Sequence, residues 1–375
     1  EFLACRGKEA QQLLDLLQEL LDLDSYSGAK PLICKALLRL SRTSGLHPQC
    51  FPIPELRTIG RQVAAGGFGD IWKGSVGQQS VSVKVMRIFQ DSDIQAVLKE
   101  FGREALIWRQ LWHPNLLPFF GLYRLNSRLC LISPWMEHGN IMEFLEKRQP
   151  PPSTILRLSL MLDVGLGLQY LHRQNIVHGD LKAINILVTP SNRACIADFG
   201  LASITSTATL RFTHSTVDSR AGTARYQAPE LLRGESNNHF GSDVYGFACV
   251  CYEILTGTVP FHDLLNEVAV ILKVIDGQRP TQPASCSGAL VLDCLWELLQ
   301  NCWEAKAETR PTASQIVERL RGPSIRAQVP ASTPDWDNKF TSKFRRSLQA
   351  RRLLPSEKQI ERILLKNCEF QSPIL

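Results

Sequence analysis

The feature that most constrains this chain of 375 residues is one short span crowded with polar side chains. Residues 178–185 read His-Gly-Asp-Leu-Lys-Ala-Ile-Asn, and a second acidic turn, Asp-Phe-Gly, follows at 198–200. Transfer of a γ-phosphoryl group requires a carboxylate to orient a hydroxyl, an ammonium group and oxygen ligands for a divalent cation. The span supplies these groups in Asp180, Lys182, Asn185 and Asp198. Each of them taken singly could be an ordinary turn residue, because loop Asp and Asn often hydrogen-bond their own backbone.

A glycine cluster lies upstream, between two runs typical of β-strands. Residues 63–71 read Val-Ala-Ala-Gly-Gly-Phe-Gly-Asp-Ile. Glycines let the backbone approach phosphate oxygens, although hairpin turns use the same residues, so the cluster alone is weak evidence. Lys84 follows in the run Val-Ser-Val-Lys-Val at 81–85. It alternates with Val83 and Val85, so on a strand it faces away from their side, toward a possible cleft.

Over residues 57–321 these motifs together resemble the eukaryotic protein kinases. That family has a Gly-rich loop, a lysine on its third strand, His-Arg-Asp-Leu-x-x-x-Asn and Asp-Phe-Gly. Ala228-Pro-Glu230 matches a further family motif, Arg310 matches the arginine that pairs with its glutamate, and Asp243 matches an aspartate beneath the catalytic loop. The tyrosine-kinase-like group is indicated by Gly66-Gly-Phe-Gly-Asp-Ile-Trp-Lys-Gly74, His113-Pro-Asn115 and Cys302-Trp…Arg310-Pro-Thr312. The form His-Gly-Asp-Leu-Lys is similar to kinases expanded in mushroom-forming fungi, and so is a helical segment before the kinase.

The resemblance implies a role for each candidate residue. Asp180 orients the substrate hydroxyl or accepts its proton, and Lys182 indicates a serine/threonine kinase. Glu104 pairs with Lys84. The expected Mg²⁺ ligands are Asn185 and Asp198. The expected ATP-binding residues are Val63, Ala64, Gly66, Gly67, Phe68, Gly69, Ile71, Lys84 and Met136. Met136 lies in an expected hinge at 132–136, which also contains Ser133.

The expected function is therefore ATP- and Mg²⁺-dependent phosphorylation of Ser/Thr in protein substrates. The alternative is a catalytically weak pseudokinase, a scaffold that binds nucleotide, because Ala64 and Gly179 depart from the family pattern. A tyrosine or dual-specificity kinase is a third possibility. Gly179 replaces an arginine that in most kinases binds a phosphate on the activation loop. We therefore expect phosphorylation between Ser203 and Ser219 not to be obligatory for activity.

A strand-rich half followed by a helix-rich half predicts an α+β fold, here the bilobal kinase fold with a β-rich N-lobe and a helical C-lobe. The strand-rich half is interrupted by a helical stretch near Gln95–Leu111, and an amphipathic stretch is expected around Glu357–Leu365. In the helical half, one apolar stripe is formed by Leu158, Met161, Val164, Leu168 and Leu171. We expect a helical hairpin extension and linker at 1–50, the kinase domain at 57–321 and a basic, partly disordered tail at 322–375. In the hairpin, residues 9–24 carry leucines at helical spacing, namely Leu13, Leu16, Leu17, Leu20 and Leu21. This stripe either binds a partner or a second copy, or packs on the following domain or on a part of the protein upstream of this sequence.

The tail accounts for most of the formal charge of +6. It could touch phosphate or an anionic membrane, but a solvated appendage whose removal leaves catalysis intact is the simpler expectation. The eleven cysteines are scattered without a Cys-x-x-Cys pair, which favours buried thiols in a reducing, cytoplasmic setting. No apolar run reaches about 18 residues, so we expect neither a transmembrane segment nor, from the motifs, a nucleic-acid partner. A targeting segment upstream stays open because the chain begins with Glu1.

Overall fold

The computed structural model forms two compact units, which we call the sheet unit (residues 1–112, 118–135 and 338–375) and the helical unit (113–117 and 136–337). Each unit is described by itself. The structure describes residues 2–22, 29–49, 53, 56–66, 69–86, 105–106, 108–125, 128–198, 203–204, 224–282, 290–322 and 334–348.

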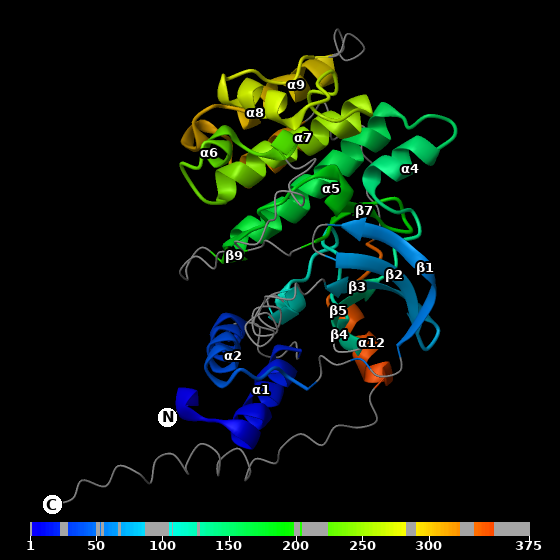
Figure 1. Cartoon of the computed structure of the whole chain (residues 1–375), viewed down its shortest axis with the longest axis vertical. Helices are drawn as coiled ribbons and strands as arrows, with labels where there is room; N and C mark the ends of the chain where they lie inside the picture. The colour runs from blue at the N-terminus through cyan, green and yellow to red at the C-terminus, as the bar shows by residue number, and fades with distance from the viewer. Residues whose placement is uncertain are drawn as a thin grey trace, which may run out of the picture. The chain divides into compact units, whose positions relative to one another are not determined.

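The sheet unit is built on five antiparallel strands, ordered β1-β2-β3-β5-β4 (Figure 1). They are β1 (Arg57–Gly66), β2 (Gly69–Val76), β3 (Gln79–Met86), β4 (Gly121–Leu125) and β5 (Arg128–Pro134). Val81, Val83 and Val85 of β3 are buried in the core of this unit together with Phe120 and Ile132. Because side chains alternate along a strand, the predicted separation of Lys84 from its two valine neighbours is confirmed.

Two helices precede the sheet, α1 (Gly7–Leu21) and α2 (Lys30–Ser44), after a short 3₁₀ turn, η1 (Phe2–Ala4). They pack on each other, as an αα-hairpin does. The predicted leucine stripe is only partly right. The buried residues of α1 are Ala10, Leu13, Leu14, Gln18 and Leu21, whereas Leu16, Leu17 and Leu20 are half-buried. The buried face is rotated because a polar residue, Gln18, lies inside it.

Gln18 is buried because the hairpin packs against helical backbone at 105–106 and 108–110. Arg109 donates to both carboxylate oxygens of Asp22 at 2.6 and 2.7 Å. The amide of Gln110 donates to Gln18 at 2.8 Å, and Gln18 donates to Asp22 at 3.1 Å. These contacts support the expectation that the hairpin packs on the following domain. The rest of the helix predicted near Gln95–Leu111, with Glu104, lies outside the described residues.

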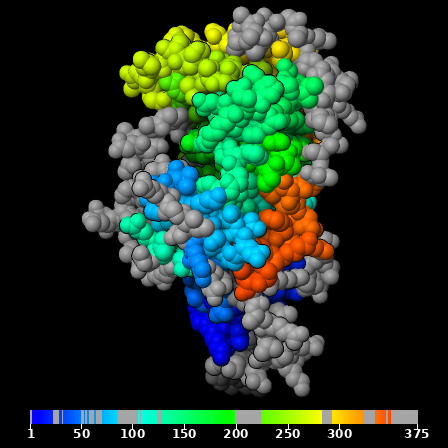
Figure 2. Space-filling model, turned by 90° about the vertical axis from the view of Figure 1, so that its right-hand side faces the viewer, coloured from blue at the N-terminus to red at the C-terminus, as the bar shows by residue number. Residues whose placement is uncertain are grey.

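A helix that the sequence analysis did not predict, α12 (Phe340–Leu348), also belongs to the sheet unit. Phe340, Phe344 and Leu348 recur at intervals of four residues and pack against the sheet core. Figure 2 shows this orange segment beside the blue residues of the strands. The expectation of a solvated appendage therefore does not hold for this part of the tail. The amphipathic stretch predicted near 357–365 lies outside the described residues.

The helical unit contains α4 (Ile141–Lys147), α5 (Thr154–Arg173), α6 (Pro229–Leu232), α7 (Phe240–Thr256), α8 (Glu267–Ile275), α9 (Leu290–Cys302) and α10 (Ala313–Leu320). Short 3₁₀ turns lie at η3 (Ala183–Asn185), η5 (Ala224–Tyr226) and η7 (Ala307–Thr309). Two small antiparallel pairs join β6 (Ile176–Val177) to β9 (Ser203–Ile204) and β7 (Ile186–Val188) to β8 (Ala194–Ile196).

The centre of the helical unit is α5, which packs against α7, α10 and β8. Its predicted apolar stripe is buried throughout, with Leu158, Met161, Val164, Leu168 and Leu171 each at most 1% exposed. In the described part of the chain, α5 alone is long and apolar enough to cross a membrane by length and composition. Half of that window is buried inside the unit, so the apolar character of α5 is already explained by core packing.

Candidate active site

The loop after β6 is held from below by one buried carboxylate. Asp243, at the first turn of α7, accepts from the backbone N–H of His178 at 2.8 Å and of Gly179 at 2.9 Å. Its Oδ2 also lies 3.0 Å from Nε2 of His172. Gly179 has a φ of +81°, a conformation that glycine adopts without steric cost. The predicted position of Asp243 beneath this loop is confirmed.

Asp180 lies at the centre of the loop, with two of the predicted site residues in contact. Lys182 places its Nζ 2.8 Å from Oδ2 of Asp180. Asn185, which ends η3, donates its amide to the backbone carbonyl of Asp180 at 2.9 Å and to Oδ2 at 3.2 Å. Burial raises the pKa of Asp180, while the Lys182 ammonium lowers it. The two donors therefore fix the orientation of a carboxylate that burial would otherwise protonate more readily.

Asp198 is joined to the same loop through the residue before it. Ala197 donates its N–H to the carbonyl of Asn185 at 2.8 Å and accepts from Nε2 of His178 at 3.0 Å. His178 also accepts at Nδ1 from the N–H of Asp180 at 3.3 Å. With one nitrogen donating and the other accepting, the ring is the neutral Nε2–H tautomer. The helical unit thus brings together Asp180, Lys182, Asn185 and Asp198, as the sequence predicted.

The remaining predicted residues lie mostly on the sheet unit. Lys84 of β3 is directly opposite Ile71 of β2, and Ile71 is opposite Ala64 of β1. Because directly opposed residues point to the same face of a sheet, Lys84 and Ile71 share one face. Val63 is exposed.

The Gly-rich run forms the β1–β2 hairpin, with Gly66 opposite Gly69. Gly67, Phe68 and the predicted Lys84 partner Glu104 lie outside the described residues, as do residues 205–223 with their Ser and Thr. Met136 is buried in the helical unit. That these residues meet Lys84 and Asp198 around one nucleotide stays a prediction.

A buried carboxylate that the sequence analysis missed supports the turn between β7 and β8. Asp163 of α5 is fully buried and accepts from Nε of Arg193 at 2.7 Å and from the N–H of Ala194 at 3.0 Å. Asn115 donates its side chain to the carbonyl of Ala194 at 2.8 Å. These residues hold the start of the strand that leads to Asp198. An acid within an apolar helix was the only available signal.

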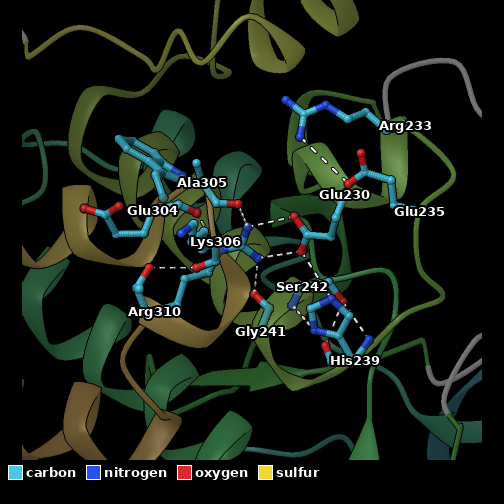
Figure 3. Close-up of polar contacts among 12 residues, drawn as sticks. Glu230, Arg233, Glu235, His239, Gly241, Ser242, Glu304, Ala305, Lys306 and Arg310 are labelled. Carbon is cyan, nitrogen blue, oxygen red and sulfur yellow. Dashed lines mark hydrogen bonds and ion pairs between the residues drawn. The ribbon is translucent and has the colours of Figure 1, made fainter.

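The predicted pairing of Glu230 with Arg310 is confirmed (Figure 3). The two guanidinium nitrogens of Arg310 donate to the two carboxylate oxygens of Glu230 at 2.7 and 2.8 Å. Arg310 also donates to the carbonyls of Gly241 and Glu304. Burial opposes ionisation of Glu230, but hydrogen bonds from His239 and Arg310 outweigh it and lower the pKa of Glu230 to about 2.

The geometry defines the class of protein. A protein kinase domain has four parts that are present here. They are the hydrogen-bonded loop Asp-x-Lys-x-x-Asn, the aspartate after the β7–β8 pair, the glycine-containing strands β1 and β2 beside the strand that carries Lys84, and the buried Glu–Arg pair. Residues 57–320 match the family model described as "Protein tyrosine and serine/threonine kinase", and the chain belongs to that family.

The relatives that the chain resembles are themselves kinases. Serine/threonine-protein kinase STY46 of Arabidopsis thaliana is 32% identical over 264 residues, which are 70% of this chain and 43% of the relative. Serine/threonine-protein kinase STY17 of the same plant is 31% identical over 289 residues, 74% and 48% of the two chains. Serine/threonine/tyrosine-protein kinase HT1, also from this plant, is 32% identical over 267 residues, 70% and 65%. The chain thus spans less than half the length of the first two.

Proposed function

We propose that this protein is a serine/threonine kinase that transfers the γ-phosphoryl group of ATP to hydroxyls of protein substrates. The observation that carries this proposal is the position of Asp180. Its Oδ2 lies 2.8 Å from Nζ of Lys182 and accepts a hydrogen bond from the side-chain amide of Asn185 at 3.2 Å. The family match and the names of the relatives support the same activity. The motifs of the tyrosine-kinase-like group suggest that the chain is a member of that group. The form His-Gly-Asp-Leu-Lys suggests a relationship to the members found in mushroom-forming fungi.

In this proposal Asp180 orients the attacking hydroxyl of the substrate and receives its proton. Lys182, held by the same carboxylate, stays next to the phosphoryl group and offsets the negative charge that develops there. The buried setting of Asp180 makes it a better proton acceptor than a solvated aspartate, because a raised pKa strengthens the base. Lys182 on Asp180 keeps the carboxylate ionised enough to act.

The donor set also fits a hard divalent cation, which we propose is Mg²⁺. The amide nitrogen of Asn185 is committed to two oxygens of Asp180, so the amide oxygen is the atom of this side chain that can bind a metal. Asp198 contributes a carboxylate, and oxygen ligands of this kind are what Mg²⁺ prefers. The metal would supply charge neutralisation on the phosphates of ATP.

For the nucleotide we propose that the two lobes of a bilobal kinase fold enclose ATP. In this proposal the adenine ring is contacted by Val63, Ala64, Ile71 and Met136, and the Gly-rich run covers the phosphates. Lys84 binds the α- and β-phosphates and Glu104 holds Lys84. The support is the shared face of Lys84 and Ile71 on the sheet. Ala64 in place of a glycine keeps a small side chain there.

The proposal is tested by radiolabelled phosphate transfer from ATP with Mg²⁺ to a generic protein substrate. Asp180→Ala should lower incorporation by about 10²- to 10⁴-fold. Glu146→Ala is the matched control, because Glu146 is an exposed carboxylate on α4, and it should leave transfer unchanged.

Nucleotide binding without transfer by the unaltered protein would favour the pseudokinase. Phosphotyrosine in the product would favour the tyrosine or dual-specificity alternative; we expect phosphoserine and phosphothreonine. Incorporation that persists in Asp180→Ala would remove that residue from its role.

We also propose a reducing, cytoplasmic setting. The eight cysteines in the described part of the chain are all free thiols, and six of them are buried. The substrates and any partner of the hairpin formed by α1 and α2 are protein surfaces that the sequence does not identify. Fractionation of cells that express the tagged protein would test the compartment.

A further inference from the structure

Beyond the matched kinase region, residues 335–336 make hydrogen bonds within the helical unit. Trp336 is 5% exposed, and its indole Nε1 donates to the backbone carbonyl of His113 at 3.1 Å. Asp335 beside it accepts from the backbone N–H of Ser191 at 3.2 Å and from the hydroxyl of the same residue. A tryptophan that is buried with its N–H satisfied makes a large and directed contact.

The carbonyl that Trp336 contacts belongs to a segment that is hydrogen-bonded to the edge of β8. The ring of His113 accepts the N–H of Asn115 at 3.1 Å. Asn115 accepts the N–H of Ile196 at 2.9 Å, and Ile196 accepts the N–H of Leu117 at 2.8 Å. Residues 113–117 therefore form an extra parallel edge on β8, centred on the bridge between Leu116 and Ile196.

The far end of β8 leads directly to the proposed metal-binding residues. Ala197 follows Ile196 and is hydrogen-bonded to both His178 and Asn185, and Asp198 comes next. The path from Trp336 to the catalytic loop thus consists of hydrogen bonds within a single unit, made by the rings of Trp336, His113 and His178 and by backbone groups. Such paths carry positional restraint when each step has one defined geometry, as short backbone hydrogen bonds do.

A second anchor lies only a few residues beyond Trp336, on the sheet unit. The ring of Phe344 stacks on Phe120 with centroids 3.8 Å apart and planes at 17°, and Phe340 lies 5.7 Å from the same ring. Phe120 is fully buried, and its N–H donates to the carbonyl of Ile132 at 2.9 Å. The stacking of Phe344 on Phe120 therefore attaches α12 to the sheet unit.

We propose that Trp336 is a positioning residue of the kinase, which acts through His113 and β8 to hold Asn185 and Asp198 in register. This inference rests on the proposed function for its catalytic readout. It assigns a role in catalysis to a residue that lies outside the kinase region, among residues that the sequence analysis treated as an appendage.

The test uses the full chain with Trp336→Phe, which keeps an aromatic ring but removes the indole N–H together with the five-membered ring that carries it. Hydrogen exchange measured by mass spectrometry should speed up in peptides covering 113–117 and 194–198, and should not change in β2 or β3. At a temperature where the variant is folded by circular dichroism, kcat should fall about tenfold and the Mg²⁺ concentration for half-maximal rate should rise. KM for the protein substrate should not change.

Phe344→Ala is the matched control, because it weakens the α12 anchor without touching the path to β8. It should lower Tm while kcat, measured where it is folded, stays within about twofold of the unaltered protein. Equal losses of kcat in the two variants, or unchanged exchange and unchanged kcat in Trp336→Phe, would overturn the proposal. If the unaltered protein transfers no phosphate, the proposed function fails, and hydrogen exchange still decides whether Trp336 holds this segment.

Discussion

Arg310 and Glu230 form a two-pronged ion pair in which the guanidinium is fully buried and the carboxylate nearly so. Both oxygens of Glu230 are engaged, at 2.7 and 2.8 Å, by the two terminal nitrogens of Arg310. The pair joins the first turn of α6 to the segment before α10, two parts of the helical unit that are 80 residues apart in the chain. The ion pair therefore fixes the position of these two segments relative to each other.

Removal of the arginine should be strongly destabilising. Arg310→Ala leaves the buried carboxylate of Glu230 without its arginine partner, and we expect the free energy of unfolding to fall by about 3–5 kcal/mol. Arg310→Lys should also be destabilising, because an ammonium cannot reproduce the two parallel hydrogen bonds. Urea unfolding followed by circular dichroism measures both.

Lys147→Ala is the control for this prediction, because Lys147 forms an exposed pair with Glu143 one helical turn away. Such a pair contributes about 0.3–0.5 kcal/mol. A loss in Arg310→Ala as small as this would show that the buried pair contributes little.

The same pair predicts how stability depends on pH. The pKa of Glu230 is about 2 in the folded protein and 4.5 when unperturbed, so between these values the unfolded chain binds more protons. The stabilisation is therefore complete above pH 4.5 and is lost as the pH falls toward 2. The difference in free energy of unfolding between the unaltered protein and Glu230→Gln should shrink over this range. A difference that does not vary between pH 5 and 3 would contradict the assignment.

Gly179 should resist substitution for a backbone reason as well as a chemical one. Its φ of +81° lies where a Cβ is unfavourable, so Gly179→Ala should cost about 1–2 kcal/mol. Gly241→Ala, in α7, is not a suitable control because its Cβ would lie 3.1 Å from His239. Gly234→Ala is suitable, since it has a similar φ of +71° and open space around the Cβ. If the two variants lose the same free energy of unfolding, backbone strain alone explains the cost. If Gly179→Ala loses more than Gly234→Ala, the substitution also disturbs the catalytic loop.

The contact between the hairpin and the domain predicts a stability coupling. Arg109 is 4% exposed and Asp22 is 16% exposed, so Arg109→Ala should lower the free energy of unfolding by about 3 kcal/mol. In the double variant with Asp22→Ala and Arg109→Ala, the loss of unfolding free energy should be smaller than the sum of the losses in the two single variants. Strict additivity in this double-mutant cycle would show that the two side chains do not interact in solution.

Lys84→Met tests the nucleotide site with little risk to the fold. The side chain of Lys84 lies on the face of β3 opposite the core valines, so its replacement removes charge without opening the core. We expect near-complete loss of phosphate transfer, with a Tm close to that of the unaltered protein. Lys73→Met, on β2, should retain transfer. Transfer by Lys84→Met at the level of the unaltered protein would refute the role of this lysine.

Local patterns in the sequence predicted much of the site. Asp180, Lys182 and Asn185 lie within six residues, so one loop conformation suffices to bring them together, and their chemical types identify phosphoryl transfer. The position of Lys84 followed from the period of a strand, and the buried stripe of α5 from the period of a helix. Such regularities survive in the sequence because neighbours in the chain are neighbours in space.

The tertiary structure decided the long-range contacts. Arg109 meets Asp22 across 87 residues, and Trp336 meets His113 across 223. Such pairs cannot be read from the period of a helix or strand. In its local sequence, each partner resembles a charged or aromatic residue on the surface, and only packing of the folded chain buries it. By itself, therefore, the sequence determined the class of protein and the chemistry of its catalytic loop. Only the folded chain showed that the hairpin and residues 335–348 are packed parts of the units that carry that chemistry.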